Sequence, residues 1–204
     1  MATYGEIVAE ILQIVPMPGR EDLIRSKVNQ MIRYVAGTGD FHRALEEVTI
    51  GTVDGVDASA RVQSIPHDSL FRSLLYVQYP EAISTEIIKV TDVKEVATLA
   101  RCRNVTNIAY VSGGNIRIKH SELTSEFNLG YYVYPAYFAT DGSDDAASNW
   151  ITELLDSLII DLTAAYMLNL NGDNEDSNRI QSMADLMSPS NIRAQVYATI
   201  NTGG

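Results

Sequence analysis

The sequence has little of what metal centres and disulfide frameworks need. It contains one cysteine, Cys102, and three histidines in 204 residues. A single cysteine excludes a disulfide within the chain and a multi-cysteine zinc or iron–sulfur site. The histidines His42, His67 and His120 stand apart, without the H-x-x-x-H or H-x-E spacing that directs two ligands to one metal ion. We therefore expect no metal and no cofactor, and structural or surface roles for these four residues.

Long apolar runs and phosphate-binding motifs are also missing. No run approaches the roughly 18 apolar residues that a membrane span needs, and no G-x-x-x-x-G-K-[ST] motif is present. We expect a chain without a membrane partner and without an enzymatic role. One enzyme class stays open, a small hydrolase with dispersed carboxylates, because such carboxylates come from distant positions in a sequence.

Basic residues are absent from one long stretch. Between Lys119 and Arg179 there is no lysine or arginine, whereas eleven aspartates and glutamates occur there and account for the whole net charge of −11. Tight nucleic-acid binding needs clustered Lys and Arg, so this chain is not expected to grip DNA. The acidic segment is either a solvated face that keeps the protein soluble or a surface that repels passing DNA.

What is present begins with two helical patterns. Apolar residues recur at a 3.6-residue period over 4–15 and again over 20–35. Thr3 and Glu6 stand three residues apart at the start of the first pattern, which is typical of a capping box. Helical periodicity returns after residue 149: one long helix is predicted over 149–170 and a shorter one over 175–187.

Between these helices the period changes to two, as in strands. Asp54-Gly55 and Ser112-Gly113-Gly114 predict hairpin turns, and residues 71–79 and 87–90 predict further strands. Residues 92–103 predict a helix. Residues 131–138, which contain Pro135, predict a last strand at a sheet edge.

The last dozen residues alternate strictly between apolar and polar. The apolar positions are Ile192, Ala194, Val196, Ala198 and Ile200. Alternation predicts an extended strand, which either returns to the protein's own sheet or forms an arm that pairs with a sheet edge of another chain. We take these five residues as candidates for binding a partner or a neighbouring subunit, and expect the domain to fold without 192–204.

The order of the elements predicts an α+β fold. Residues 1–45 and 141–188 are expected to form a helical bundle. Residues 46–140 are expected to form an inserted antiparallel β-rich module, and residues 189–204 a C-terminal extended arm.

The chain resembles the head-to-tail adaptor proteins of tailed bacteriophages, the group that includes the tail tubular protein A of short-tailed phages. Four motifs carry the resemblance, in this order. They are Asp22-Leu-Ile-Arg-Ser-Lys-Val-Asn-Gln-Met-Ile-Arg33, Ile65-Pro66-His-Asp-Ser69, Tyr131-Tyr-Val-Tyr-Pro-Ala-Tyr137 and Ala164-Ala165-Tyr-Met-Leu168-Asn-Leu-Asn-Gly172-Asp173. They are similar to the "I-N-x-A-x-R-x-I" helix of these adaptors, their "L-P-x-D" turn, an aromatic strand, and their "A-A-x-x-L-x-x-x-G-D" helix end.

The resemblance implies a structural virion protein, assembled in the host cytoplasm and located in the neck or tail. It would form a ring, typically twelvefold, that docks below the portal protein, seals the DNA channel and receives the tail nozzle or tail fibre proteins. DNA would pass through without specific binding, so Glu153, Asp156 and Asp161 are candidates for lining the channel. A head-completion stopper and a tail-nozzle component are the alternatives within the same class.

Overall fold

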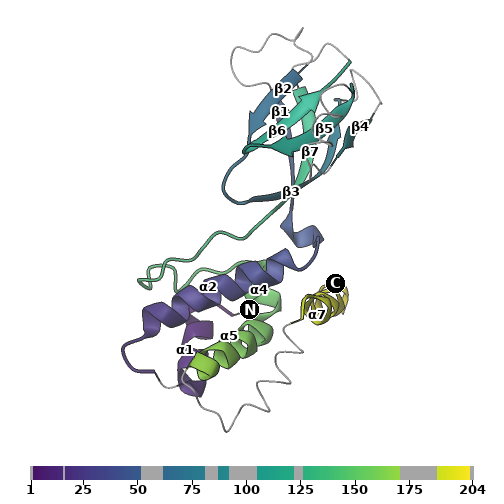
Figure 1. The fold of residues 1–204 in the computed structure, drawn as a ribbon. Coiled ribbons are helices and arrows are strands. Elements are labelled where there is room, and N and C mark those ends of the chain that lie inside the picture. Colours follow the sequence, from purple (N-terminus) through teal and green to yellow (C-terminus); the bar gives the residue numbers. More distant parts are fainter. Residues whose placement is uncertain are drawn as a thin grey trace. The chain divides into compact units, whose positions relative to one another are not determined.

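The computed structural model describes residues 2–15, 17–51, 62–80, 87–91, 105–121, 126–170 and 188–202. The chain divides into two compact units (Figure 1). The helical unit combines Met1–Arg43 with Tyr134–Gly204, and the β unit is Ala44–Val133. The fold is therefore α+β, with a sheet inserted in the chain between N-terminal and C-terminal helices, as the sequence predicts.

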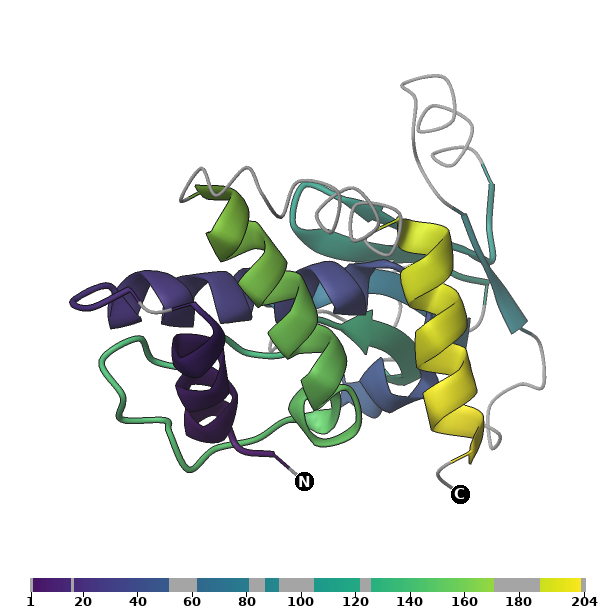
Figure 2. The ribbon, with the colours of Figure 1, turned by 90° about the horizontal axis from the view of Figure 1, so that it is seen from below.

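Among the described residues the helical unit contains five α-helices. They are α1 (Tyr4–Ile14), α2 (Glu21–Gly37), α4 (Trp150–Leu154), α5 (Asp156–Leu170) and α7 (Pro189–Thr202). Figure 2 shows α5 and α7 both crossing α2, in agreement with the contacts between these helices. A short 3-10 helix, His42–Ala44, leads into the β unit.

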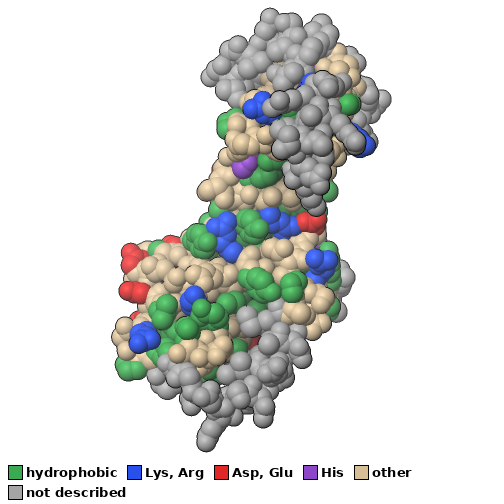
Figure 3. Space-filling model, viewed as in Figure 1, with side chains coloured by type: hydrophobic (Ala, Val, Ile, Leu, Met, Phe, Trp, Pro, Cys, Tyr) green, Lys and Arg blue, Asp and Glu red, His purple; other side chains and the backbone are tan. Residues whose placement is uncertain are grey.

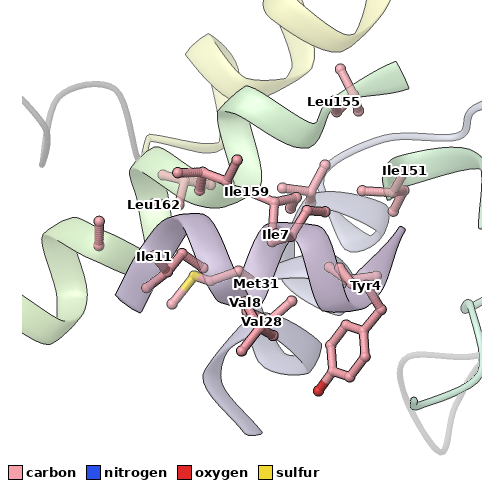
Figure 4. Close-up of a cluster of buried hydrophobic side chains, with 14 of the residues drawn as sticks. Tyr4, Ile7, Val8, Ile11, Val28, Met31, Ile151, Leu155, Ile159 and Leu162 are labelled. Atoms are coloured by element: carbon pink, nitrogen blue, oxygen red, sulfur yellow. The ribbon is translucent and has the colours of Figure 1, made fainter. Parts of the chain in front are cut away.

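A single apolar core holds the helical unit together. Ile7 and Ile11 from α1 meet Val28 and Met31 from α2 and Ile159 from α5 (Figure 4). Ile7, Ile11, Val28 and Ile159 are fully buried, and burying one such side chain contributes about 1.5–3 kcal/mol. The core therefore joins helices from both ends of the chain.

The start of α1 is the capping box that the sequence predicts. The Thr3 side chain accepts from the Glu6 N–H at 3.3 Å, and the Glu6 carboxylate accepts from the Thr3 N–H at 2.8 Å. These two bonds hold the pKa of Glu6 below its usual range, because they favour the ionised form. They satisfy donors that a helix start leaves without an intrahelical partner.

The single helix predicted over 149–170 is wrong, because the chain leaves the α region at Leu155 (φ −133°, ψ 26°). The Leu155 N–H donates to the Ile151 oxygen at 2.8 Å, and its own oxygen accepts from the Ile159 N–H at 3.0 Å. Leu155 thus ends α4 and begins α5. The Asp156 carboxylate accepts from the Ser157 N–H at 2.8 Å, and its negative charge lies in the first turn of α5, where the helix dipole favours it.

The extended arm predicted over 189–204 is wrong as well, since Pro189–Thr202 is the helix α7. Ile192 and Val196 are fully buried in the core of the helical unit. They stand four residues apart, which is one turn of a helix. Tertiary burial of this pair selects the helix over the strand that alternation favours. Proline is also well tolerated at a first helical position.

The described residues of the β unit form one seven-stranded sheet with the order β1-β7-β3-β4-β5-β6-β2. The strands are β1 (Leu45–Gly51), β2 (Val62–Pro66), β3 (Phe71–Gln78), β4 (Ile87–Val90), β5 (Ile108–Ser112), β6 (Asn115–Lys119) and β7 (Glu126–Val133). Every pairing is antiparallel except that of β4 with β5, which is parallel. The sheet is therefore mixed, whereas the sequence predicts an antiparallel module.

Some predictions for the middle of the chain are confirmed, and others fall outside the described residues. The hairpin at Ser112-Gly113-Gly114 is confirmed: β5 and β6 flank it, with φ of 61° at Gly113 and 76° at Gly114, values that glycine adopts readily. The strands predicted at 71–79 and 87–90 appear as β3 and β4. The turn at Asp54-Gly55 and the helices at 92–103 and 175–187 lie outside the described residues.

The last predicted strand is displaced and is not at an edge. β7 begins at Glu126, ends at Val133 and lies between β1 and β3. Tyr134–Phe138 belongs instead to the helical unit. Pro135 lies beyond the strand and therefore disturbs no sheet bond.

Gly130 of β7 has no side chain and so leaves room for the Tyr76 ring of β3. A Cβ atom at this position would stand 2.2 Å from the Tyr76 ring, whose hydroxyl donates to Glu47 at 2.6 Å. We expect Gly130→Ala to displace that ring and to lower the free energy of unfolding of the β unit by about 1–3 kcal/mol. Equilibrium unfolding followed by far-UV circular dichroism measures this. In a Tyr76→Ala background, where the ring is absent, Gly130→Ala should lower the free energy of unfolding much less than it does in the native chain. An equal loss in both backgrounds would contradict the explanation.

A polar network ties residues 134–149 to α1 and α2. The buried Asn29 amide donates to the Phe138 oxygen and accepts from the Phe138 N–H, both at 2.9 Å. The Tyr4 hydroxyl donates to the Arg25 oxygen at 2.9 Å. Burial raises the pKa of Tyr4 to about 12. The Arg25 guanidinium forms an ion pair with Asp145, one of its two bonds measuring 3.0 Å.

The ion pair between Arg25 and Asp145 makes the stability of the helical unit depend on pH. The Arg25 guanidinium holds the pKa of Asp145 below its usual range by hydrogen bonding to the carboxylate. A lowered pKa contributes stability that is present above the unfolded value of about 4 and is lost as the pH falls through the folded value. We expect Asp145→Asn to lower the melting temperature at pH 7, and the difference between the two proteins to shrink as the pH falls below about 4. Thermal unfolding across pH 2.5–7 measures this; Asp22→Asn is the exposed control, and a constant difference across the range would contradict it.

Candidate assembly surfaces

A groove lies between the start of α5 and the second half of α7. Its volume is about 420 Å³. The break at Leu155 positions it, because the chain turns there and the first residues of α5 become part of the wall. The lining residues are Leu154, Leu155, Asp156, Ser157, Leu158, Asp161, Leu162, Gln195, Ala198 and Thr199. We call this surface the acidic groove.

The acidic groove combines an apolar wall with negative charge. Leu155 and Leu162 are buried, whereas Leu158 is half-buried and leaves apolar surface open. Asp156 and Asp161 are the charged residues of the lining, and neither forms an ion pair with a lysine or arginine of the described residues. Such a surface suits an apolar side chain accompanied by a cation.

Two of the three candidate channel-lining residues meet in this groove. Glu153 does not line it: its carboxylate accepts from the Ser148 hydroxyl at 2.7 Å. Of the five partner-binding candidates, Ala198 lines the groove and Ala194 is exposed. Ile192 and Val196 are in the core, and the side chain of Ile200 lies outside the described residues. The structure thus brings Asp156, Asp161 and Ala198 together and separates the others.

A second surface, which the sequence did not predict, carries arginine and tyrosine. The Arg33 guanidinium lies 4.7 Å from the centre of the Tyr134 ring and 4.6 Å from that of Tyr137. Tyr137 is 58% exposed, the largest fraction among the exposed bulky hydrophobic side chains of the described residues. We call Arg33, Tyr134 and Tyr137 the arginine ledge. The pair of tyrosines in Tyr134-Pro-Ala-Tyr137 is the one sequence signal for this surface. It was not recognised because residues 131–138 were predicted to form a strand.

A shallow hollow of about 300 Å³ adjoins the ledge. Its described lining residues are Arg33, Tyr34, Gly37, Thr38, Tyr134, Pro189 and Arg193, and these include two cations and no carboxylate. Arg193 donates from Nε to the Thr38 oxygen at 2.7 Å and so fixes the start of α7 to the end of α2. Figure 3 shows basic side chains among hydrophobic ones on this view of the helical unit.

Three further titratable residues have structural surroundings, namely His67, His120 and Asp144. His67 stacks on Phe71, and His120 is buried beside Tyr79 and Phe127. Asp144 accepts from the Ala139 N–H at 2.6 Å. Within the described ranges no group of three or more His, Cys, Asp or Glu is placed to hold a metal ion. Cys102 lies outside those ranges.

No family model matches the chain, and no curated protein matches it significantly. In the part of the chain that the structure describes, no helix has the length and apolar character to cross a membrane.

Proposed function

We propose that this chain is a structural virion protein of a tailed bacteriophage, a head-to-tail adaptor. It assembles with its own copies into a ring below the portal protein, seals the DNA channel and offers the platform for the tail. The observation that carries the proposal is the order of the fold. Two N-terminal helices and the C-terminal helices share one core, and a β unit is inserted between them. The adaptors that the sequence resembles have this order of helices and β insertion.

The charge of the chain supports a role around DNA without binding it. Glu153, Asp156 and Asp161 lie in the segment that has no basic residue, and negative groups keep a passing polyanion from adhering. Glu153 is the channel-lining candidate outside the groove. Asp156 and Asp161 lie in the acidic groove, where contact with another protein gives their charge a second use.

Co-expression with the portal protein of the same virus tests the proposal. The chain should co-purify with the portal oligomer, and native mass measurement should find one copy of the chain for each portal subunit. A chain that stays monomeric while assembled portal is present would contradict it. Binding only to a portal already carrying another ring would identify a stopper or nozzle component instead.

A further inference from the structure

The acidic groove and the arginine ledge are placed to be used at the same time. The acidic groove includes residues of α7, and so does the hollow that adjoins the arginine ledge. Successive residues of an α-helix turn by about 100° around its axis. Pro189 and Arg193, beside the ledge, lie within about 40° of each other. Gln195, Ala198 and Thr199, in the groove, lie about 140–240° from Arg193. The groove and the hollow beside the ledge are therefore on opposite faces of α7, and a partner in the groove approaches this helix from the side opposite the hollow.

The two surfaces also complement each other chemically. The groove offers leucine side chains and two carboxylates, Asp156 and Asp161. The ledge offers an exposed aromatic ring, Tyr137, with the Arg33 guanidinium stacked against it. Stacking leaves the guanidinium N–H groups free for a carboxylate in the plane of the group. Neither Arg33 nor Asp161 forms an ion pair with another described residue.

We propose that the arginine ledge of one copy docks in the acidic groove of the next. Tyr137 of one copy enters the acidic groove of the next and contacts its leucine side chains. Arg33 pairs with Asp161 at the edge of the groove, and Asp156 adds negative charge nearby. Because one surface meets a different surface on the neighbour, the contact is head-to-tail, and repetition closes into a ring when the rotation permits. The inference rests on the proposed function and specifies which residues join neighbouring subunits.

We assign the groove to a second copy because a surface of complementary charge and apolar character is present on this chain. An arginine that already contacts two tyrosine rings loses little further side-chain freedom on docking, which favours association. An aromatic residue with an adjacent arginine is also the composition typical of the energetic centre of an interface.

Charge reversal on each side tests the pairing. Sedimentation velocity of the full-length chain should show that Asp161→Arg and Arg33→Glu each weaken self-association at least tenfold. An equal mixture of the two variants should recover it, because every contact in an alternating assembly again joins opposite charges. The controls Asp22→Arg and Arg20→Glu change exposed charges elsewhere and should leave association unchanged. Variants that self-associate as the native chain does, or a mixture that fails to recover, would overturn the pairing.

Cross-linking keeps the test decisive if the native chain is monomeric at the concentrations of sedimentation. In a Cys102→Ser background, Ala136→Cys beside the ledge and Ala198→Cys in the groove are mixed and treated with a short bis-maleimide. The heterodimer should exceed either homodimer several-fold, whereas Ala146→Cys in place of Ala136→Cys should give no such excess. Absence of the excess would overturn the contact. Portal binding measured on the same variants separates the two claims: loss of the contact with portal binding intact leaves the proposed function standing.

Discussion

Replacing Ile192 and Val196 together with alanine should lower the free energy of unfolding of the helical unit by about 4 kcal/mol. Both side chains are fully buried in the core that joins α1, α2 and α5. Truncating them removes apolar contact and leaves cavities, and each truncation costs about 2 kcal/mol or more. The expectation from sequence, that the domain folds without 192–204, is therefore replaced: we expect that deletion to destabilise the helical unit.

Trp150 makes this measurement specific to one unit. It is the only tryptophan, and its ring packs 5.8 Å from that of Phe41 inside the helical unit. Urea unfolding followed by its fluorescence reports on this unit directly. Ala194→Ser, on the exposed side of α7, is the matched control and should change stability by less than about 0.5 kcal/mol. A double variant as stable as the native chain would contradict the placement of α7.

Replacing Asn29 with leucine should cost about 2–4 kcal/mol of stability in the same unit. The two side chains have similar size, so the change removes hydrogen bonds without opening a large cavity. The loss follows because the Phe138 N–H and oxygen, both bonded to Asn29 at 2.9 Å, would remain buried without partners. A buried donor or acceptor left unsatisfied costs more than an average hydrogen bond contributes.

The neighbouring Gln30 provides the control for this change. It is exposed on α2 and accepts from Lys27 at 2.9 Å. Gln30→Leu should cost less than about 0.5 kcal/mol, because a bond at an exposed site is exchanged for one to water. Equal losses for Asn29→Leu and Gln30→Leu would show that the amide bonds to residue 138 do not hold the segment.

Features of the fold that a local sequence pattern determines by itself could be predicted from the sequence. The Thr3 and Glu6 spacing specifies reciprocal bonds at a helix start, and it formed as expected. Gly113-Gly114 specifies positive φ at two consecutive positions, and a hairpin formed there. The change of period from 3.6 to 2 and back indicated an α+β fold, which is shown.

Some sequence patterns fit two kinds of secondary structure, and they gave wrong predictions because tertiary contacts decide between the two. Ile192 and Val196 fit both an alternating strand and one turn of a helix, and the core selects the helix. Residues 150–166 continue a helical period across Leu155, so no apolar position reveals the break. Tyr131–Phe138 is rich in β-forming residues, but the ladder with β1 ends at Tyr132 and the ladder with β3 ends at Val133.

The candidate site was predictable in its charges and not in its shape. The absence of basic residues pointed to Asp156 and Asp161. Their shared groove requires the break at Leu155 and the helical form of α7, and both were predicted otherwise. The arginine ledge depends on α2 meeting residues 134–137 across a hundred positions of sequence, a contact that no local pattern contains.

Electron cryomicroscopy of purified virus particles tests the central claim most directly. The account predicts copies of this chain in a closed ring around the DNA channel at the neck, with the helical units of neighbours in contact. Particles that lack the chain, or that carry it as separate copies away from the channel, would contradict it.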